Sequence, residues 1–563
     1  MKNLAVSTLA LSVMLSSHAV MAEQAQPKLI LQVTVDALRG DLPDRFKHNF
    51  GEGGFNLLLN DGIHYTNAHY QHSNTETIVG HAALATGAPP AVNGMVGNLW
   101  YDRTQERVVY NIEDANYNLL ASGADVDQST EIDSTQRAAQ GDGRSPANIH
   151  TSTIGDEIVK AYHGQSRAFS VSFKDRGAVS LGGELGKAFW FSKSANAFVT
   201  SDYYYDANPT WVDEWNAKGF TQQYGSKRWE LSLPQEKYLF AGDGDVEYKI
   251  DLANFSRSFP HPYGPASFPY FTTLLSLSPA GDEIVADFAK EVIDAEKLGQ
   301  GDYPDYLSVS FSATDYVIHM YGPSSIEAED NLIRLDRTLA DLFAHVDKTV
   351  GLENTLIVLS ADHGAPDVPG YVNALGGNKA DYFGIEKMKQ SGVFEAVEKR
   401  FGLGEDVVRQ YADPYLYLNH ELIGAKGYNL AEVQAYIARL LENINGINQA
   451  ITATDIMKGQ LADTRINQLV TNNHHPIRSG DIYIVYEPNV YINDFDGLKV
   501  ASVHGSPWRY DTFVPVIFAG MNIEGQRISR EVTPYYIAPT ISQYLRITFP
   551  TGSAGEVLNE VIE

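Results

Sequence analysis

Five short runs of almost continuous apolar residues constrain the fold of this chain more than any other feature. They cover Leu29–Val35, Arg167–Phe173, Tyr306–Phe311, Thr355–Ser360 and Phe513–Ala519. Strands of a parallel sheet are covered by helices on both faces, so they read as apolar runs rather than as alternating patterns. We therefore predict that the five runs are strands of one buried parallel sheet.

Helical patterns lie between the predicted strands. Apolar residues recur at helical spacing from Leu332 to Val346 and from Ile284 to Val292, with charged residues on the opposite face in the first of these segments. Asn429 followed by Glu432 is typical of a helix N-cap with a reciprocal acid, and it opens a predicted helix through Leu441. Strands that alternate with helices predict a doubly wound α/β fold, with a mostly parallel sheet flanked by helices.

The length of 563 residues allows two to four domains, or one large α/β domain that carries insertions. Two long segments, at about 190–300 and 366–500, interrupt the strand pattern, and the second is far longer than a normal crossover. We interpret residues 23–563 as a single domain with these two insertions. Residues 120–147 are rich in Asp, Ser, Gln and Gly, and we interpret them as a solvated loop.

Residues 1–22 are typical of a secretory signal peptide. Lys2 supplies a positive charge, an apolar run follows from Leu4 to Leu15, and Ala22 ends a stretch suited to cleavage. We expect the mature chain to begin near Glu23 and to be periplasmic or secreted. No later stretch approaches 18 apolar residues, so we predict no membrane span.

Composition excludes several classes of function. Acidic residues outnumber basic residues by 70 to 42, giving a formal net charge of -28, which argues against a nucleic-acid-binding surface or an anionic membrane as partner. The chain has no cysteine, so disulfides, thiolate metal sites and a cysteine nucleophile are excluded. Any bound metal must be held by imidazole, carboxylate or hydroxyl groups.

Acidic residues and histidines gather just beyond the predicted strands. They are Asp36, Asp315, His319, Asp362, His363 and His504. Each alone has a simpler explanation, because a strand-end Asp often caps a helix and a single His is often structural. Together they are the ligand types of Zn²⁺ in a protein without cysteine, and six such ligands suit two ions roughly 4 Å apart. In open α/β sheets, ligands bind at this edge.

A candidate nucleophile lies in the segment from Asn74 to His81. A helix is predicted to start there, and Thr77 stands near its first turn. Thr77 can be a simple N-cap residue. A hydroxyl at a helix N-terminus is also well placed to attack a phosphate group, because the exposed N–H groups and the positive helix end stabilise the anion.

These segments together resemble the alkaline phosphatase superfamily, and within it the PafA-type enzymes related to type I phosphodiesterases and nucleotide pyrophosphatases. The resemblance is carried by VDALRGD, TETIVGHAALATG, GNLWYD, ATDYVIH, ADHG and the HG that precedes the last predicted strand. It implies a cofactor of two Zn²⁺ ions and insertions that cap the active site. By this resemblance the ligands of one ion are Asp315, His319 and His504, and those of the other are Asp36, Asp362, His363 and the oxygen of Thr77.

Three further residues resemble the substrate-binding groups of this branch. Asn98 matches an asparagine that contacts a phosphoryl oxygen, and Lys174 with Arg176 resembles a Lys/Arg pair that related diesterases lack. A monoester presents one more unesterified oxygen than a diester, and Arg offers it a planar fork while Lys offers a point charge. Taken alone, the KDRG segment is more typical of an ordinary charged turn; its place after a predicted strand, alongside the other candidate residues, favours substrate binding.

The resemblance implies a secreted, zinc-dependent alkaline phosphatase that hydrolyses small phosphate monoesters through a phosphothreonine intermediate, acting as a monomer or small homo-oligomer. One alternative is a nucleotide pyrophosphatase or phosphodiesterase with the same two-metal site. A second alternative is a noncatalytic anion-binding protein. Lys174 and Arg176 favour the monoesterase over the diesterase.

Overall fold

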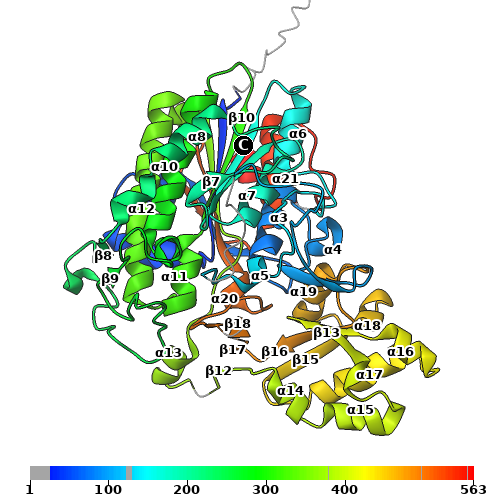
Figure 1. Ribbon diagram of the computed structural model, residues 1–563. Coiled ribbons are helices and arrows are strands. Elements are labelled where there is room, and N and C mark those ends of the chain that lie inside the picture. The colour runs from blue at the N-terminus through cyan, green and yellow to red at the C-terminus, as the bar shows by residue number, and fades with distance from the viewer. Residues whose placement is uncertain are drawn as a thin grey trace, which may run out of the picture.

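The computed structural model describes residues 26–121, 130–377, 379–492, 494–495, 498–554 and 556–562. The expected signal peptide, residues 1–22, lies outside the described residues. The core is a nine-stranded sheet (Figure 1). Its strands, in spatial order, are β21 (Gln526–Ile528), β2 (Ile63–His69), β20 (Phe513–Gly520), β11 (Thr355–Ser360), β1 (Leu29–Val35), β10 (Asp305–Phe311), β5 (Ala168–Ser172), β6 (Lys187–Ser192) and β7 (Ala197–Val199).

Four of the five predicted strands pair in parallel at the centre of the sheet. Strand β1 lies between β11 and β10, and β10 pairs with β5. The fifth, β20, is a strand but runs antiparallel to both β11 and β2, so its predicted parallel orientation is wrong. The chain enters β20 at the carboxyl edge of the parallel strands without a crossover to the opposite edge. Strand β20 therefore runs antiparallel to them.

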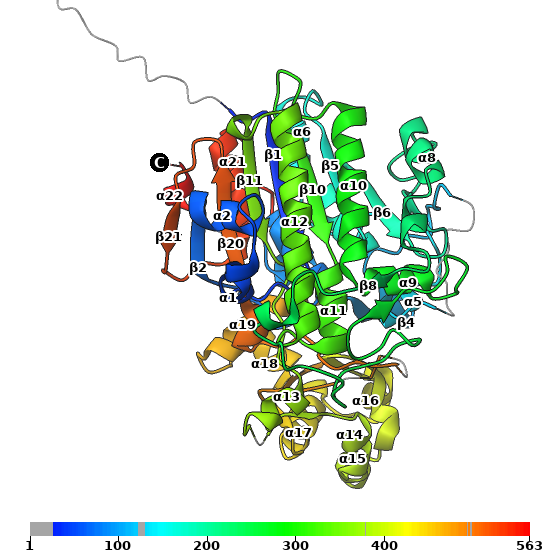
Figure 2. The same ribbon diagram turned by 90° about the vertical axis from the view of Figure 1, so that its left-hand side faces the viewer.

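Helices cover both faces of the sheet, as Figures 1 and 2 show, and the predicted doubly wound architecture is confirmed. One face carries the long helices α10 (Pro279–Glu296) and α12 (Ile326–Thr349), which contain both predicted apolar repeats. The other face carries α3 (Thr77–Thr86), α6 (Ile154–Ala161), α7 (Asp175–Gly182) and α21 (Ile537–Leu545). Leu29, Leu31, Val33 and Val35 of β1 belong to one hydrophobic cluster, and Ile30 belongs to another.

A smaller antiparallel sheet forms within the second predicted insertion. Its strands are β13 (Val408–Ala412), β14 (Tyr415–Leu418), β16 (Ile482–Tyr486) and β15 (Ile447–Thr452), in that spatial order. Together with α15 (Val393–Phe401) and α17 (Leu430–Leu441), it encloses a hydrophobic cluster of its own. We call residues 379–492 the small lobe; it lies below the main body in Figure 1. The interpretation of residues 23–563 as one domain stays a prediction.

Asn429 caps α17, as predicted, by accepting a hydrogen bond from the Ala431 N–H at 2.9 Å. The predicted reciprocal capping contact of Glu432 is not formed; its carboxylate instead pairs with Arg400 at 3.1 Å. In the part of the chain that the structure describes, no helix combines the length and apolar character needed to cross a bilayer.

Candidate active site

The predicted metal ligands lie together at the carboxyl edge of the parallel strands. Asp36 follows β1, Asp315 and His319 lie on α11 (Ala313–Tyr321) after β10, and Asp362 with His363 follows β11. His504 reaches the same place from the loop before β20. Among the described residues, two groups bring their ligand atoms within 4.8 Å of one another, namely Asp315, His319 and His504, and Asp36, Asp315 and His363.

Asp315 belongs to both groups and joins them. Its Oδ1 lies 3.3 Å from His319 Nε2 and 3.4 Å from His504 Nε2. In the second group His363 Nε2 lies 3.4 Å from Asp36 Oδ1 and also 3.4 Å from Asp362 Oδ2. The structure therefore brings together all six of the carboxylates and imidazoles that the sequence singled out.

The three histidines are held in the same way. His319 Nδ1 lies 2.7 Å from the Ser502 carbonyl oxygen, and His504 Nδ1 lies 2.8 Å from that of Thr75. His363 Nδ1 lies 2.9 Å from the Gly364 carbonyl oxygen. A ring that donates from Nδ1 presents Nε2 as a ligand, and outer carbonyls of this kind orient the histidines of metal sites.

The cluster has the donors of a metal site and lacks the hydrogen bonds of a packed core. Asp36 Oδ1, Asp315 Oδ1, Asp362 Oδ2 and His363 Nε2 are buried without a hydrogen-bond partner among the described residues. Burial raises the pKa of Asp362, and the nearby Asp36 carboxylate raises it further. Buried carboxylate oxygens without a partner are costly unless a cation contacts them. Oxygen and nitrogen donors fit a divalent metal ion such as Zn²⁺, Mn²⁺ or Co²⁺.

Thr77 is the first residue of α3 and is fixed beside this cluster. The N-cap residue is Glu76, and no side chain caps the helix, so Thr77 is not the cap. Gly80 packs against the backbone of Asp362, where a Cβ would lie 1.9 Å from the carbonyl oxygen. His81 Nδ1 lies 2.8 Å from the Thr77 carbonyl oxygen, so it supports the helix.

Arg176 on α7 contacts Thr77, and Lys174, the residue before α7, contacts the carboxylates beside it. Arg176 Nη2 lies 3.3 Å from Thr77 Oγ1. Lys174 Nζ lies 2.7 Å from Asp36 Oδ2 and 2.6 Å from Asp315 Oδ2. Burial disfavours the Lys174 ammonium, but the two carboxylates outweigh burial and raise its pKa. The KDRG segment is therefore buried in the site and is not a solvent-exposed charged turn.

Asn98 stands directly before β3 (Leu99–Asp102), opposite the start of α3. Its Oδ1 accepts the Ile78 N–H at 3.1 Å, and its own backbone N–H donates to Glu76 Oε2 at 2.7 Å. Within the described residues, its side-chain NH₂ group has no acceptor, which leaves it available to an oxygen of a ligand.

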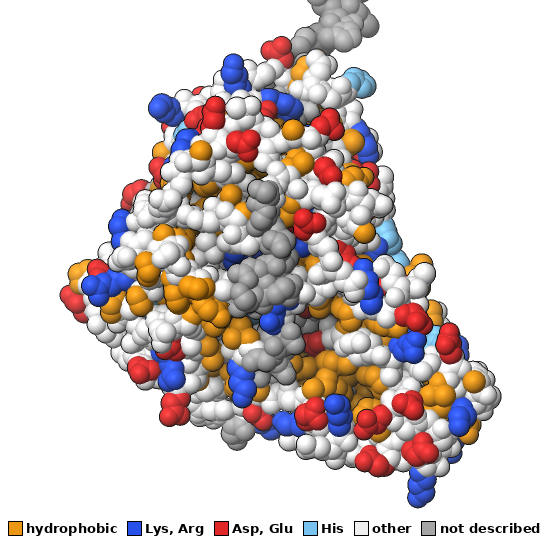
Figure 3. Space-filling model, in the orientation of Figure 1, with side chains coloured by type: hydrophobic (Ala, Val, Ile, Leu, Met, Phe, Trp, Pro, Cys, Tyr) orange, Lys and Arg blue, Asp and Glu red, His pale blue; other side chains and the backbone are white. Residues whose placement is uncertain are grey.

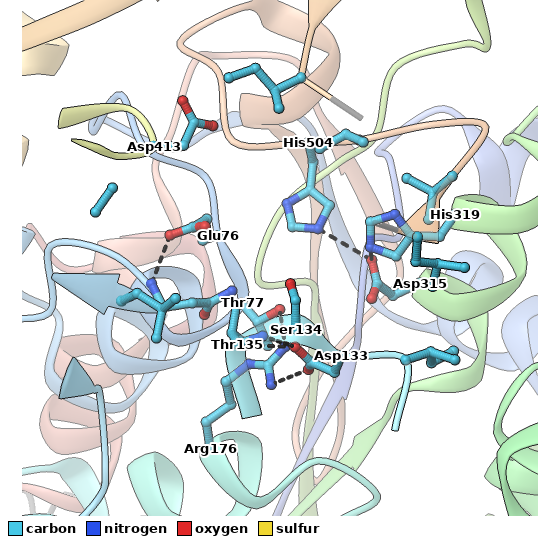
Figure 4. Close-up of a pocket in the computed structure, with 18 of the residues that line it drawn as sticks. Glu76, Thr77, Asp133, Ser134, Thr135, Arg176, Asp315, His319, Asp413 and His504 are labelled. Carbon is cyan, nitrogen blue, oxygen red and sulfur yellow. Dashed lines mark hydrogen bonds and ion pairs between the residues drawn. The ribbon is translucent and has the colours of Figure 1, made fainter. Parts of the chain in front are cut away.

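A cavity of about 310 Å³ opens in front of Thr77. Figure 4 shows Thr77 and Arg176 on one side, and Asp315, His319 and His504 on another. Residues 410–412 of strand β13 and Asp413 after it line the cavity from the small lobe. In Figure 3 hydrophobic side chains gather where the small lobe meets the main body. The site thus combines a polar floor with an apolar wall.

Sequence reasoning missed one side of this cavity. Ile132, Asp133 and Thr135 line the site and are buried, so the prediction of a solvated loop is wrong for this part of residues 120–147. Asp133 Oδ2 pairs with Arg176 Nη1 at 2.6 Å, and Asp133 also caps the short helix α5 (Ser134–Arg137). In the sequence, only the positive charge of Arg176 indicated that an acidic partner is needed.

Comparison with known proteins identifies the family. The sequence profile described as Type I phosphodiesterase / nucleotide pyrophosphatase matches residues 30–507. The chain belongs to this family. An alkaline phosphatase, PhoV of Synechococcus elongatus, is 30% identical over 550 residues, which cover 96% of this chain and 94% of the relative.

Two further relatives match over nearly their full length. The alkaline phosphatase PafA of Elizabethkingia meningoseptica is 30% identical over 541 residues, which cover 95% of each chain. A protein of Myroides odoratus named Calcium-transporting ATPase is 31% identical and covered to 97%. The crystal structure of wild-type PafA matches with a TM-score of 0.86 and 29% identity, over 96% of this chain and 99% of that chain. This member of the phosphodiesterase family is therefore a phosphoester hydrolase of the alkaline phosphatase superfamily.

Proposed function

We propose that this chain is a secreted, zinc-dependent phosphomonoesterase that releases inorganic phosphate through a phosphothreonine intermediate. The observation that carries the proposal is the approach of Arg176 Nη2 to within 3.3 Å of Thr77 Oγ1, with Lys174 lining the same cavity. Two cations beside the nucleophile suit a monoester dianion better than a diester monoanion. Residues 1–22 support export, and the predicted cleavage near Ala22 is part of the proposal.

In the first step the Thr77 oxygen attacks phosphorus, and the alcohol leaves from the opposite side with a proton. Arg176, Lys174 and the Asn98 NH₂ group bind the non-bridging oxygens as their charge redistributes. In the second step water hydrolyses the Thr77 phosphoester and restores the hydroxyl. Two zinc ions held by Asp315, His319 and His504 and by Asp36, Asp362 and His363 would lower the pKa of the attacking groups and neutralise the leaving oxygen.

A second solved structure supports the choice of residues around the phosphate. It is a variant of PafA, 28% identical to this chain with a TM-score of 0.86, in which one threonine, one asparagine, one lysine and one arginine are replaced. Its threonine and asparagine have the same separation as Thr77 and Asn98, and its lysine and arginine have the same separation as Lys174 and Arg176. We therefore assign the four residues of this chain to the reaction.

The decisive experiment compares kcat/KM for an aryl phosphate monoester with that for the matching diester, with metal analysis on the same sample. A clear preference for the monoester is expected. A preference for the diester would instead assign the phosphodiesterase alternative. Absence of activity in protein with its full metal content would favour the noncatalytic anion-binding alternative.

Replacing Lys174 and Arg176 together by alanine is expected to lower monoester kcat/KM on the order of 10²–10⁴-fold, because each charge-assisted hydrogen bond contributes about 1.5–3 kcal/mol. The diester rate should change far less, so the monoester preference should collapse. Lys218→Ala is the matched control, since Lys218 pairs with Glu291 at the surface, 2.7 Å away. Equal losses for both substrates would contradict a monoester-specific role.

Asp133→Asn is expected to lower monoester kcat/KM roughly 10- to 100-fold, because a group misplaced by about 1 Å can cost 10²-fold. Asparagine keeps an acceptor for the Thr135 N–H, which Asp133 binds at 3.0 Å, so the change removes the charge facing Arg176 and keeps the helix cap. The same change made in an Arg176→Ala background should have little further effect. An undiminished loss in that background would show that Asp133 acts independently of Arg176.

A further inference from the structure

Asn473 of the small lobe is buried where the lobe meets the main body. It is the last residue of α19 (Arg465–Asn473), and its side chain is fully inaccessible to solvent. Its Oδ1 accepts the Asn74 N–H at 3.1 Å, and its Nδ2 donates to the Val96 carbonyl at 3.1 Å. Nδ2 also donates to Tyr415 OH of the small lobe at 2.7 Å. The amide therefore uses its acceptor and both of its donors.

The two main-body partners of Asn473 belong to the segments that carry Thr77 and Asn98. Asn74 lies three residues before Thr77, and Val96 lies two residues before Asn98. One side chain of the small lobe thus binds both segments, a few residues before Thr77 and before Asn98. Asn473 is the acceptor of the Asn74 N–H, and a buried N–H without an acceptor is costly.

A continuous set of hydrogen bonds connects Asn74 and Val96 with the side chain of Asn98. Asn74 Nδ2 donates to the Val96 carbonyl and to Glu76 Oε2, both at 3.0 Å. The same Glu76 oxygen accepts the Asn98 N–H at 2.7 Å. The Asn98 side chain then accepts the Ile78 N–H at 3.1 Å, next to Thr77. Together these contacts fix the side-chain NH₂ of Asn98 relative to the Thr77 hydroxyl.

The small lobe also holds the outer part of the Asn98 segment. Strand β3 continues through a turn into β4 (Arg107–Tyr110), and Arg103 in this turn donates to the Leu418 carbonyl at 3.2 Å. Arg409 of the lobe donates to Tyr101 OH at 3.1 Å. The lobe therefore contacts this hairpin at Tyr101 and Arg103, and Asn473 contacts Val96 just before it.

We propose that Asn473 is a positioning residue that aligns Asn98 with the phosphoryl group during attack by Thr77. The inference deepens the proposed function and rests on it, because it requires Asn98 to bind a phosphoryl oxygen. The small lobe then contributes to the rate of the chemical step in addition to lining the cavity.

Asn473→Ala tests this directly with an aryl phosphate. It is expected to lower kcat about 10- to 100-fold, the size of effect that a misplacement of about 1 Å produces, with metal content unchanged. Asn467→Ala is the matched control, because Asn467 is a partly exposed asparagine of the same helix whose side chain donates to Ala462 within the lobe. Tyr415→Phe is the milder second variant, since it removes one partner of Asn473 and keeps both main-body contacts; a smaller loss of kcat is expected.

A double-mutant cycle separates positioning from a structural role. In an Asn98→Ala background, adding Asn473→Ala or Tyr415→Phe is expected to change kcat by less than about threefold, since residues that act as a unit are non-additive. Losses that multiply fully, or unchanged kcat in both single variants, would overturn the inference while leaving the proposed function intact. An Asn98→Ala enzyme with unaltered kcat and KM would remove Asn98 from the proposed reaction and overturn the inference.

Discussion

Thr77→Ala is expected to abolish turnover of phosphate monoesters, with a loss in kcat of at least about 10³-fold, the scale seen when a covalent nucleophile is removed. The hydroxyl lies at the start of α3, where Arg176 Nη2 is 3.3 Å away, and no other hydroxyl is assigned to the attack. Alanine at this first helical position costs little stability, because the side chain makes no cap hydrogen bond. The variant should therefore fold with its metal bound.

The measurement combines steady-state kinetics with metal analysis and a thermal melt on each variant. Thr77→Ser keeps the hydroxyl and should retain most of the activity. Acid-quenched wild-type enzyme should carry one phosphoryl group on the peptide that contains Thr77, and the alanine variant should carry none. Full activity in Thr77→Ala with normal metal content would refute the assignment of the nucleophile.

The metal-binding edge of the sheet was predictable because it follows from local signals. The runs that became β1, β10 and β11 are apolar over nearly their whole length, and their polar successors are conspicuous by contrast. Carboxyl ends of parallel strands share one edge, so Asp36, Asp315 and Asp362 had to lie near one another. Strand β20 was predicted as a strand, but its direction was not, because a buried apolar run carries no sign of its direction.

Long-range partners were not predictable in this way. Asp133 and Thr135 stand in a polar stretch that is typical of a solvated loop, and only folding brings Asp133 against Arg176. Asn473 is separated from Asn74 by 399 residues, and a single asparagine has no periodicity that could announce the contact. Burial of polar residues is decided by their partners, so it is visible only in the structure.

In the small lobe the sequence analysis recognised an interruption and one helix, α17, but none of the strands. Strand β13 contains Arg409 and Gln410 among its five residues, and β14 and β16 are apolar but only four and five residues long. The sequence did show that the segment between β11 and β20 is far longer than a normal connection between strands. The structure adds that this interruption supplies the wall of the cavity and, through Asn473, contacts to the segments that carry Thr77 and Asn98.

Removing the metal is expected to abolish hydrolysis and to lower Tm. Asp36, Asp315 and Asp362 are each at most 2% exposed, and Lys174 is the cation that contacts two of them. A ligand present at 100 times its Kd stabilises the folded state by about 2.7 kcal/mol, and this contribution is lost on chelation. Activity and Tm should return when Zn²⁺ is added back. Retained activity in metal-free protein would contradict the two-metal proposal.

The count of ions can be tested separately from their role. Metal analysis of the wild type should give two ions per chain. His504→Ala removes a ligand from the group with Asp315 and His319 only, so one ion should remain and activity should be lost. Asp294→Asn is the control, since Asp294 is an exposed residue that pairs with His345 at 2.9 Å, outside both groups. Two ions in His504→Ala would contradict the assignment of this ligand.

The stabilisation by metal should also depend on pH in a defined direction. In the metal-free protein burial disfavours the His363 imidazolium, but the Asp362 and Asp36 carboxylates outweigh it and raise the pKa of His363 to about 9 from 6.5. A raised pKa contributes stability that is complete below pH 6.5 and is lost as pH rises through about 9. A metal ligand must be deprotonated, so the metal-loaded protein lacks this contribution. The difference in Tm between loaded and chelated protein should therefore widen from pH 6.5 to pH 9, and a constant difference would show that His363 does not exchange a proton for metal.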